Sequence, residues 1–437
     1  MKYFSTRDTN QQFAFSLRDA VLKGLAPDGG LFMPAEIPVL GADTLKKMPQ
    51  MPLPELAFHL LNPFLQEDIA PHVLAGICNE AFNFEIPVRQ LTDGVFCLEL
   101  FHGPTLAFKD VGARFMARLL PQLNNENKPL KVVVATSGDT GSAVASGFHN
   151  VEGIEVFVLF PKGKVSPAQR MQLCSWGNNI TAIEIDGSFD DCQRHVKTLL
   201  SDENALNHQL ITSANSINIA RLLPQMVYYA WLWSRLDAPT PVVSVPSGNF
   251  GNLTAGLMAR AMGISINKFV ASTNVNDVFP AFLHSGKFVS RPSVATISNA
   301  MDVGNPSNFE RMLHLFNGDV AQMRKHISAF SFSDDQTRNA VAELWKNHAY
   351  IADPHAAVGY LGLMQYIETC KFTGNAAFLA TAHPAKFAEV VEACIETHIV
   401  VPPRLEAFGR KKDLSTACKN DYAEVRSMVL EHRGALS

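Results

Sequence analysis

Short apolar runs alternate with longer amphipathic stretches along the chain from residue 94 onward. Seven of these runs are rich in β-branched and aromatic residues, and they begin at residues 94, 131, 154, 179, 208, 240 and 267. From residue 131, successive runs start 23 to 32 residues apart, which leaves room for a strand, a crossover helix and two loops. We therefore predict parallel strands with helices on both faces of the sheet, which is an α/β fold.

Both ends of the chain carry a helical pattern instead. The pattern of the first 85 residues predicts three helices, at residues 10–34, 53–65 and 70–82. The first of them ends in a turn rich in proline and glycine. After residue 300, further helices are predicted at residues 307–318, 334–348 and 353–370. One more apolar run, at residues 375–384, is suited to return to the sheet. The prediction is an α/β protein with a mainly helical N-terminal extension.

Composition narrows the class of protein. With 437 residues, 47% of them hydrophobic and 18% charged, the chain can bury a full core and has the length of two or three domains. Its net charge is -4 and its basic residues form no stripe, so we expect a small-molecule partner and no nucleic acid. Seven scattered cysteines without metal-ligand spacing predict reduced thiols and no metal site. Without a signal peptide or an apolar run of about 20 residues, a soluble, cytoplasmic protein is expected.

The loop at residues 247–252, "SGNFGN", follows one predicted strand and precedes a helical pattern. In parallel sheets ligands bind beyond the carboxyl ends of the strands. Two glycines three residues apart let backbone N–H groups point inward, and the helix adds its positive end, so the loop is suited to hold a phosphate. An ordinary strand-to-helix turn has the same pattern. NAD is disfavoured, because the next acid, Asp277, lies inside the following helical pattern and not at the position of a ribose ligand.

Two other polar stretches are candidate ligand sites. In "SGDTGSA", residues 137–143, Ser137, Asp139 and Thr140 could bind a carboxylate through hydroxyl and N–H groups. Capping of the next helix explains Asp139 or Thr140 equally well. In "SANSINIARLLPQ", three residues share one face if the segment is helical, and they are suited to bind a phosphate: Asn215, Asn218 and Arg221. A solvated helix face is the more common explanation of such a pattern.

Lys109 lies in "GPTLAFKD", where "GPT" predicts a turn and the residues that follow carry a helical apolar stripe. A cation in the first turn of a helix opposes the helix dipole at a cost of roughly 0.3 to 1 kcal/mol, which lowers its pKa by well under one unit. Burial lowers a lysine pKa by up to about 3 to 5 units. A buried, uncharged Lys109 would suit Schiff-base chemistry, whereas a plain surface lysine is equally compatible with the pattern.

Five stretches taken together resemble the bacterial and yeast-type threonine synthase family, in order and at fitting spacing from about residue 3 to 400. They are "LKGLAPDGGLFMP" at 22–34, "GPTLAFKD" at 103–110, "TSGDTGSA" at 136–143, "PSGNFGN" at 246–252 and "TAHPAKF" at 381–387. The resemblance implies a pyridoxal 5'-phosphate enzyme with the tryptophan-synthase β fold. Such an enzyme converts O-phospho-L-homoserine and water to L-threonine and phosphate. It also implies a division into an extension (1–85), a smaller domain (120–222) and a larger cofactor domain (86–119 with 223–437).

The resemblance further assigns roles to individual residues. Lys109 matches the lysine that holds the cofactor, and Thr381 matches the partner of the pyridine nitrogen. The backbone of five residues would hold the cofactor phosphate: Gly248, Asn249, Phe250, Gly251 and Asn252. Ser137 and Thr140 are candidates for the substrate carboxylate. The candidates for its phosphate are Arg221, Asn215, Asn218 and Lys162.

Asp139 stands where many members of the wider superfamily have an asparagine beside the phenolic oxygen of the cofactor. An ionised aspartate cannot donate a hydrogen bond, so Asp139 either points elsewhere or is protonated. Three alternatives stay open at this point. They are a nicotinamide oxidoreductase, a catalytically inactive protein with the cofactor fold, and a phosphohomoserine lyase that does not make threonine.

Overall fold

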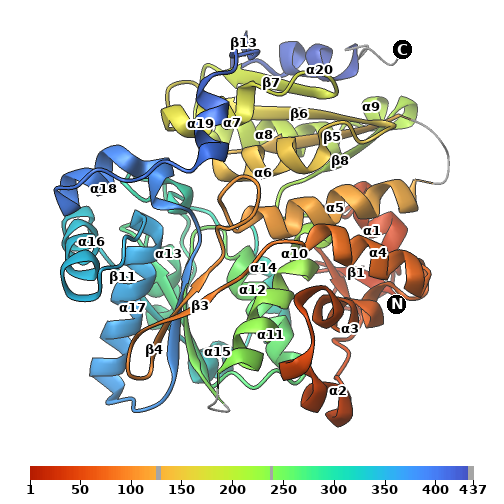
Figure 1. The fold of residues 1–437 in the computed structure, drawn as a ribbon. Helices are drawn as coiled ribbons and strands as arrows, with labels where there is room; N and C mark the ends of the chain where they lie inside the picture. Colours follow the sequence, from red (N-terminus) through yellow and green to blue (C-terminus); the bar gives the residue numbers. More distant parts are fainter. Residues whose placement is uncertain (125–128, 237–239, 432–437) are drawn as a thin grey trace.

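The strands form two separate sheets, with a small two-stranded ribbon near the N-terminus (Figure 1). The computed structural model describes residues 1–124, 129–236 and 240–431. Helices cover the faces of both sheets (Figure 1). The predicted α/β class is confirmed.

The larger sheet has the strand order β11-β10-β9-β12-β4-β3. Its strands are β3 (Val88–Thr92), β4 (Val95–Glu99), β9 (Val242–Pro246), β10 (Lys268–Thr273), β11 (Ile327–Ser331) and β12 (Ala376–Ala380). Neighbours are parallel except the β3–β4 pair, which is antiparallel. The runs at 94, 240, 267 and 375 are confirmed as strands, whereas β3 and β11 were not predicted. Both are edge strands with several partly exposed positions, so neither shows a continuous apolar run.

The smaller sheet is wholly parallel, with the order β13-β7-β6-β5-β8. It consists of β5 (Leu130–Ala135), β6 (Ile154–Pro161), β7 (Ile180–Ile185), β8 (Leu210–Ser213) and β13 (Thr416–Cys418). The runs at 131, 154, 179 and 208 are confirmed. β13 comes from the end of the chain, although the sequence placed every residue after 223 with the larger domain. Three residues are too few to show a period of two.

The helices pack on the sheets according to the alternation of strand side chains. In β5, Val132 and Val134 face α6, and Val133 and Ala135 face α8. Seven helices lie between β4 and β9 in the described chain. They are α5 (Lys109–Leu123), α6 (Asp139–Phe148), α7 (Pro167–Cys174), α8 (Phe189–Leu200), α9 (Glu203–His208), α10 (Ile219–Leu222) and α11 (Met226–Arg235).

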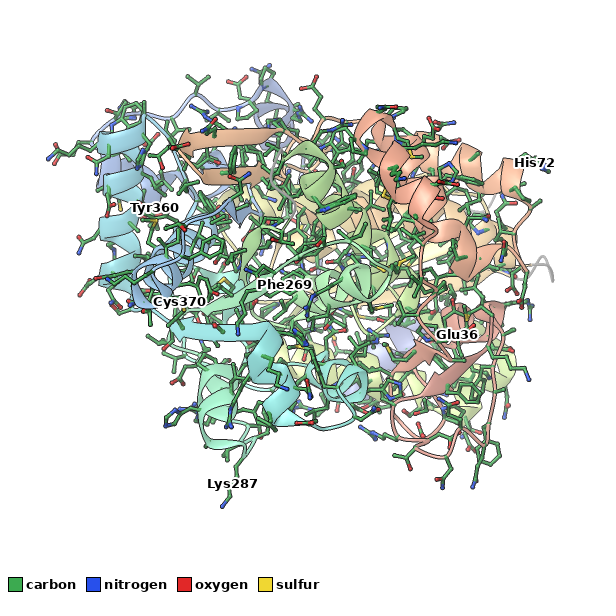
Figure 2. All side chains as sticks on the ribbon, turned by 90° about the horizontal axis from the view of Figure 1, so that it is seen from below. Glu36, His72, Phe269, Lys287, Tyr360 and Cys370 are labelled. Atoms are coloured by element: carbon green, nitrogen blue, oxygen red, sulfur yellow. The ribbon has the colours of Figure 1, made fainter. Side chains whose placement is uncertain are left out.

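Most of the later helices enclose the larger sheet, with α12 and α17 on opposite faces, whereas α19 contacts α7 and α20 packs on the smaller sheet. They are α12 (Gly251–Ala261), α13 (Val278–Ser285), α14 (Phe309–Leu315), α15 (Val320–His326), α16 (Asp334–His348), α17 (Pro354–Cys370), α18 (Ala388–Ile395), α19 (Pro403–Gly409) and α20 (Tyr422–Leu430). Short 3-10 turns are η1 (Met48–Gln50), η2 (Leu223–Gln225), η3 (Asn299–Met301) and η4 (Pro384–Phe387). Seen from below, Phe269 of β10 lies among packed side chains, whereas Lys287 and His72 project at the periphery (Figure 2).

The N-terminal extension is mainly helical, as predicted, but its first part differs from the expectation. It contains β1 (Tyr3–Ser5), α1 (Leu17–Lys23), β2 (Phe32–Pro34), α2 (Ala42–Lys47), α3 (Leu53–Leu65) and α4 (Pro71–Ala81). The helix expected over 10–34 is wrong for most of that range, because Ser16 caps α1 and residues 32–34 pair with β1. The other two predicted helices are confirmed as α3 and α4.

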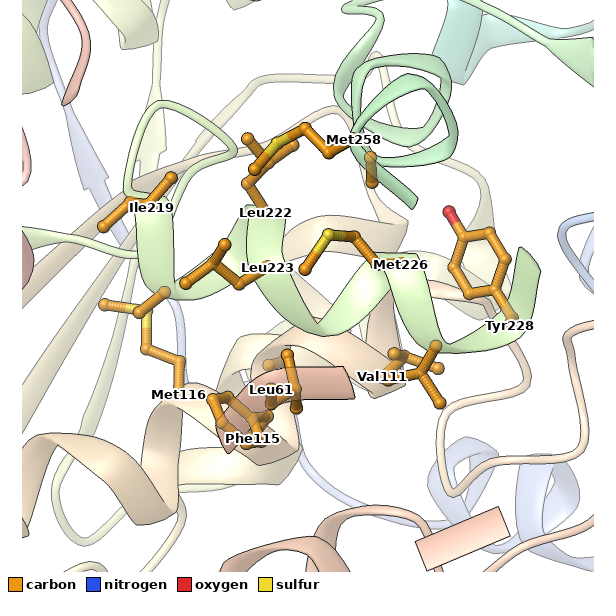
Figure 3. Packing of buried hydrophobic residues seen from close by; sticks show 14 of the residues in the cluster. Leu61, Val111, Phe115, Met116, Ile219, Leu222, Leu223, Met226, Tyr228 and Met258 are labelled. Carbon is orange, nitrogen blue, oxygen red and sulfur yellow. The ribbon is translucent and has the colours of Figure 1, made fainter. Parts of the chain in front are cut away.

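One apolar cluster fixes the helices that carry the candidate residues. Side chains from α3, α5, α10, η2, α11 and α12 meet there, among them Leu61, Phe115 and Leu222 (Figure 3). Because α5 begins at Lys109 and α10 contains Arg221, this packing sets the position of one relative to the other. A search of the described residues finds no helix long and apolar enough to cross a membrane.

Candidate active site

Two adjoining hollows lie where loops of the two sheets face each other, and Lys109 lines both. We call them the glycine-loop hollow and the arginine hollow. The glycine-loop hollow is lined by residues including Gly248 to Asn252, His355 and Thr381. The arginine hollow is lined by residues including Ser137, Thr140, Asn215, Arg221 and Asp302. Asp139 lines both hollows.

A backbone bridge places Lys109 beside the end of β12. The N–H of Phe108 donates to Thr381 O at 2.9 Å, and the N–H of His383 donates to Leu106 O at 3.0 Å. Leu106 has a φ of 60°, a left-handed conformation that costs about 1 kcal/mol in a residue with a side chain. The bridge therefore turns the chain sharply before α5 and brings Lys109 and Thr381 to one hollow.

Lys109 is only partly exposed, which excludes the plain surface lysine. Burial, with the positive charge of Arg221, lowers the pKa of Lys109 to about 8, although Asp139 acts in the opposite direction. Burial is the largest cause, as the sequence argument required. A substantial part of the Lys109 side chains is then uncharged near neutral pH and able to act as a nucleophile or a base.

Residues 248–252 present an unpaired row of backbone donors. Their N–H groups make no hydrogen bond within the described part of the chain, and α12 begins at Gly251, so the positive end of the helix faces the same loop. This arrangement fits a phosphate. The residue with a left-handed backbone is Phe250, at a φ of 60°, so the glycines do not serve the curl that the sequence argument gave them.

Gly248 instead permits a close approach between two loops. A Cβ atom there would lie 2.7 Å from Met301 Cα and 3.0 Å from Ala300 O. Because the obstacle is backbone, a side chain at this position forces the glycine loop away from residues 300 and 301.

We expect Gly248→Ala to lower the free energy of unfolding by about 1 to 3 kcal/mol through overpacking, and to weaken binding of inorganic phosphate. Urea unfolding and phosphate titration measure the two effects. Gly76→Ala is the matched control, since no atom lies within 4 Å of a Cβ there and alanine is favoured in a helix. Equal stability of the two variants would contradict this explanation.

Arg221 is a buried cation that forms no ion pair with a carboxylate among the described residues. It is 2% exposed; one Nη donates to Ala214 O, and Nε has no partner. No carboxylate lies within 4.0 Å of it among the described residues. Burial lowers the pKa of Arg221 to about 10, so it remains charged at neutral pH. A buried charge with free N–H groups fits a bound anion.

The expected helical face at Asn215, Asn218 and Arg221 is wrong, because α10 begins only at Ile219. Asn215 does line the arginine hollow, but its amide bonds the backbone of Ala135. Asn218 caps α10, is buried, and donates to Val21 O at 2.9 Å. It lines neither described hollow, and neither does Lys162, which is exposed.

The loop before α6 offers further donors to the arginine hollow. Within the described residues, the backbone N–H groups and hydroxyls of Ser137 and Thr140 have no hydrogen-bond partner. Thr136 Oγ1 instead accepts from Gly138 and Gly141. The two hydroxyls and their N–H groups are thus free to bind a carboxylate.

Asp139 forms a buried ion pair. Its Oδ1 lies 2.6 Å from Lys386 Nζ and accepts from Gln169 Nε2 at 3.0 Å. Although burial acts to raise the pKa of Asp139, the charge and hydrogen bond of Lys386, with the bond from Gln169, hold it below its usual value. Of the two alternatives, the structure therefore favours an ionised Asp139 directed at Lys386.

Sequence reasoning missed three lining or supporting residues. Asp302 lines the arginine hollow, and burial raises its pKa to about 6 against the hydrogen bonds from Thr296. His355 lines the glycine-loop hollow, held by Asp353 at 2.6 Å. Lys386 lies within the "TAHPAKF" stretch, which was noted without a role for that lysine. The pairing of Lys386 with Asp139 could not be read from a local pattern, since the two residues are distant in sequence.

Comparisons with known proteins cover the whole chain. The model of pyridoxal-phosphate dependent enzymes matches residues 84–381, and models of the threonine synthase N terminus and C-terminal region match residues 2–82 and 356–429. Threonine synthase of Escherichia coli (strain K12) is 40% identical over 99% of this chain and 100% of its own, and that of Haemophilus influenzae is 39% identical over the same shares.

Solved structures agree with these relatives. The crystal structure of threonine synthase from Escherichia coli has a TM-score of 0.93 at 39% identity, and covers 99% of this chain and 100% of that one. A PLP-bound threonine synthase from Brucella melitensis has a TM-score of 0.91 at 34% identity, with 99% of both chains covered. A threonine deaminase from Solanum lycopersicum, at 16% identity and a TM-score of 0.57 over 82% of this chain and 92% of that one, shares the fold.

Proposed function

Because this chain belongs to the threonine synthase family of pyridoxal-phosphate enzymes, we propose that it is a carbon–oxygen lyase that forms L-threonine and phosphate from O-phospho-L-homoserine and water. One observation carries the proposal. Lys109, a lysine with a lowered pKa, lies where a row of free backbone donors and an anion-free arginine meet. The two hollows match a cofactor phosphate and a substrate phosphate.

The residues of the glycine-loop hollow fit the cofactor. The amine of Lys109 would hold its aldehyde, the N–H groups of 248–252 its phosphate, and the Thr381 hydroxyl, which has no partner in the described chain, its ring nitrogen. When bound, pyridoxal phosphate supplies an electron sink for charge that develops on the substrate carbons. A neutral hydroxyl partner leaves the ring nitrogen largely unprotonated, which suits transfer of charge onward to a leaving group.

Lys109 is also the proposed base. Once substrate is bound, its Nζ takes the proton from the α carbon and then carries a proton at the β carbon. A pKa of about 8 lets the same amine accept and return a proton near neutral pH.

The arginine hollow would hold the rest of the substrate. Arg221 provides charged donors for the substrate phosphate, and Asn215 lines the same hollow. Ser137 and Thr140 would bind the carboxylate through free N–H and hydroxyl groups. Asp139 lines both hollows and is paired with Lys386. Its contact with the cofactor remains a prediction.

The alternatives have less support. A nicotinamide oxidoreductase would need a ribose acid, whereas Asp277 directly precedes α13 and pairs with Arg291. The relatives named above that match over the full length are threonine synthases. The division into domains 120–222 and 86–119 with 223–437, amended for β13, and the cytoplasmic location remain predictions.

Purified protein supplied with O-phospho-L-homoserine tests the proposal. We expect visible absorbance from the bound cofactor, and phosphate and threonine released in equal amounts. A colourless protein would contradict the cofactor assignment, and phosphate released with a keto acid in place of threonine would favour the simpler lyase.

A further inference from the structure

A buried ion pair joins the two halves of the site. Lys386 belongs to η4, directly after β12 of the larger sheet, and Asp139 is the first residue of α6 on the smaller sheet. Their side chains are 0% and 6% exposed, and Lys386 Nζ lies 2.6 Å from Asp139 Oδ1. The same Nζ donates to Thr105 O at 3.0 Å, in the turn that leads to Lys109. One lysine thus contacts both the acid beside Lys109 and the turn before it.

The acid of this pair faces Lys109. Asp139 lines both hollows together with Lys109, and its Oδ2 makes no hydrogen bond within the described chain. A carboxylate beside a lysine favours the charged ammonium form, and Asp139 acts to raise the pKa of Lys109 in this site. Lys109 needs the uncharged form for the chemistry proposed above.

We propose that Lys386 is a positioning residue that neutralises Asp139 and so leaves Lys109 free to lose its proton. The inference rests on the proposed function, since it concerns the lysine to which that function assigns the cofactor. A second effect follows from the bond to Thr105, whose own N–H and hydroxyl donate to Asp110 at 2.9 and 2.7 Å. Lys386 therefore also holds the turn from which Lys109 extends.

Other charged groups around Lys109 do not substitute for this pair. Arg221 on α10 lowers the pKa of Lys109. Asp110 on α5 is directed at Thr105, and Asp302 beside η3 accepts from Thr296 and Asn274. His355 Nε2 accepts from the Ala300 N–H, and its Nδ1 lies 2.6 Å from Asp353 Oδ2. Asp139 remains the acid that acts on Lys109, and Lys386 is its cationic partner.

Four full-length proteins test the inference: wild type, Lys386→Met, Asp139→Asn and the double variant. Each is freed of cofactor, mixed with pyridoxal phosphate at a series of pH values, and followed by visible absorbance. The midpoint of the rate against pH reports the proton equilibrium of Lys109. We expect a midpoint near 8 for wild type and a midpoint about 1 to 3 units higher for Lys386→Met. At pH 7 this makes colour formation at least about tenfold slower.

Rescue separates this role from a merely structural one. Asp139→Asn is expected not to raise the midpoint, and the double variant is expected to return to the wild-type value, because the charge that Lys386 offsets is gone. Lys287→Met, on the exposed surface, is the control. An unchanged midpoint in Lys386→Met, or a raised midpoint in the double variant, overturns the inference.

Lys386→Met alone can fail to fold, because it leaves a buried carboxylate without its partner. The double variant leaves no buried charge at this place. If Lys386→Met does not fold, the midpoint of the double variant is compared with that of Asp139→Asn. A wild-type protein that forms no coloured product contradicts the proposed function and the inference with it. Equal midpoints in all four proteins contradict the inference alone.

Discussion

Replacing Lys109 by alanine is expected to lower the rate of threonine formation by at least about 10³-fold, since proton transfer by a positioned base contributes roughly 10²- to 10⁴-fold and the covalent anchor of the cofactor is lost with it. The visible absorbance of the protein should shift or disappear. The fold should persist, because removing a partly buried ammonium whose pKa burial has already lowered leaves no unpaired partner behind. Phosphate release, the visible spectrum and thermal unfolding give the three readouts.

Lys287→Ala is the matched control for this variant, because Lys287 is exposed and projects at the periphery (Figure 2). It should keep wild-type activity and colour. A Lys109→Ala protein with more than a few per cent of the wild-type rate would contradict the assigned role.

Replacing Arg221 by methionine should raise KM for the phosphorylated substrate by about 10- to 150-fold for each charged hydrogen bond lost, at 1.5 to 3 kcal/mol per bond. The change should also raise the pKa of Lys109, because the charge of Arg221 lowers it in the native site. The optimum of the pH profile therefore moves upward. Arg221→Lys keeps the charge but not the planar set of donors. We therefore expect its pH profile to return closer to that of the wild type than its KM does.

Steady-state kinetics as a function of pH separate the two effects, and inhibition by inorganic phosphate gives an independent measure of anion binding. Arg338→Met, an exposed arginine paired with Asp335 on α16, is the control. An Arg221→Met protein that binds substrate and phosphate as the wild type does would show that the anion lies elsewhere.

Local patterns predicted most of the central fold. The apolar runs of β5 to β10 are visible because each strand is buried on both faces, and the loops at their carboxyl ends contain Ser137 and Gly248. The edge strands β3 and β11 were missed because their partly exposed side chains break the run. β13 was missed because three residues carry no period, and its place is fixed only by pairing with β7.

Within the site, sequence indicated which residues meet but not why. Gly248 was taken as a source of backbone freedom, whereas contact with Ala300 and Met301 requires it. Asn218 looked like a ligand, yet it holds the backbone of the N-terminal extension at Val21. The pairing of Lys386 with Asp139 depends on how two sheets face each other, and no local pattern records that.

We propose that Lys109, and no other lysine, holds the cofactor. Borohydride reduction of the purified holoenzyme, followed by proteolysis and mass spectrometry of the labelled peptides, tests it most directly. We expect one reduced cofactor on the peptide that contains Lys109. A label on a different lysine, such as the neighbouring Lys386, with none on Lys109 would contradict it.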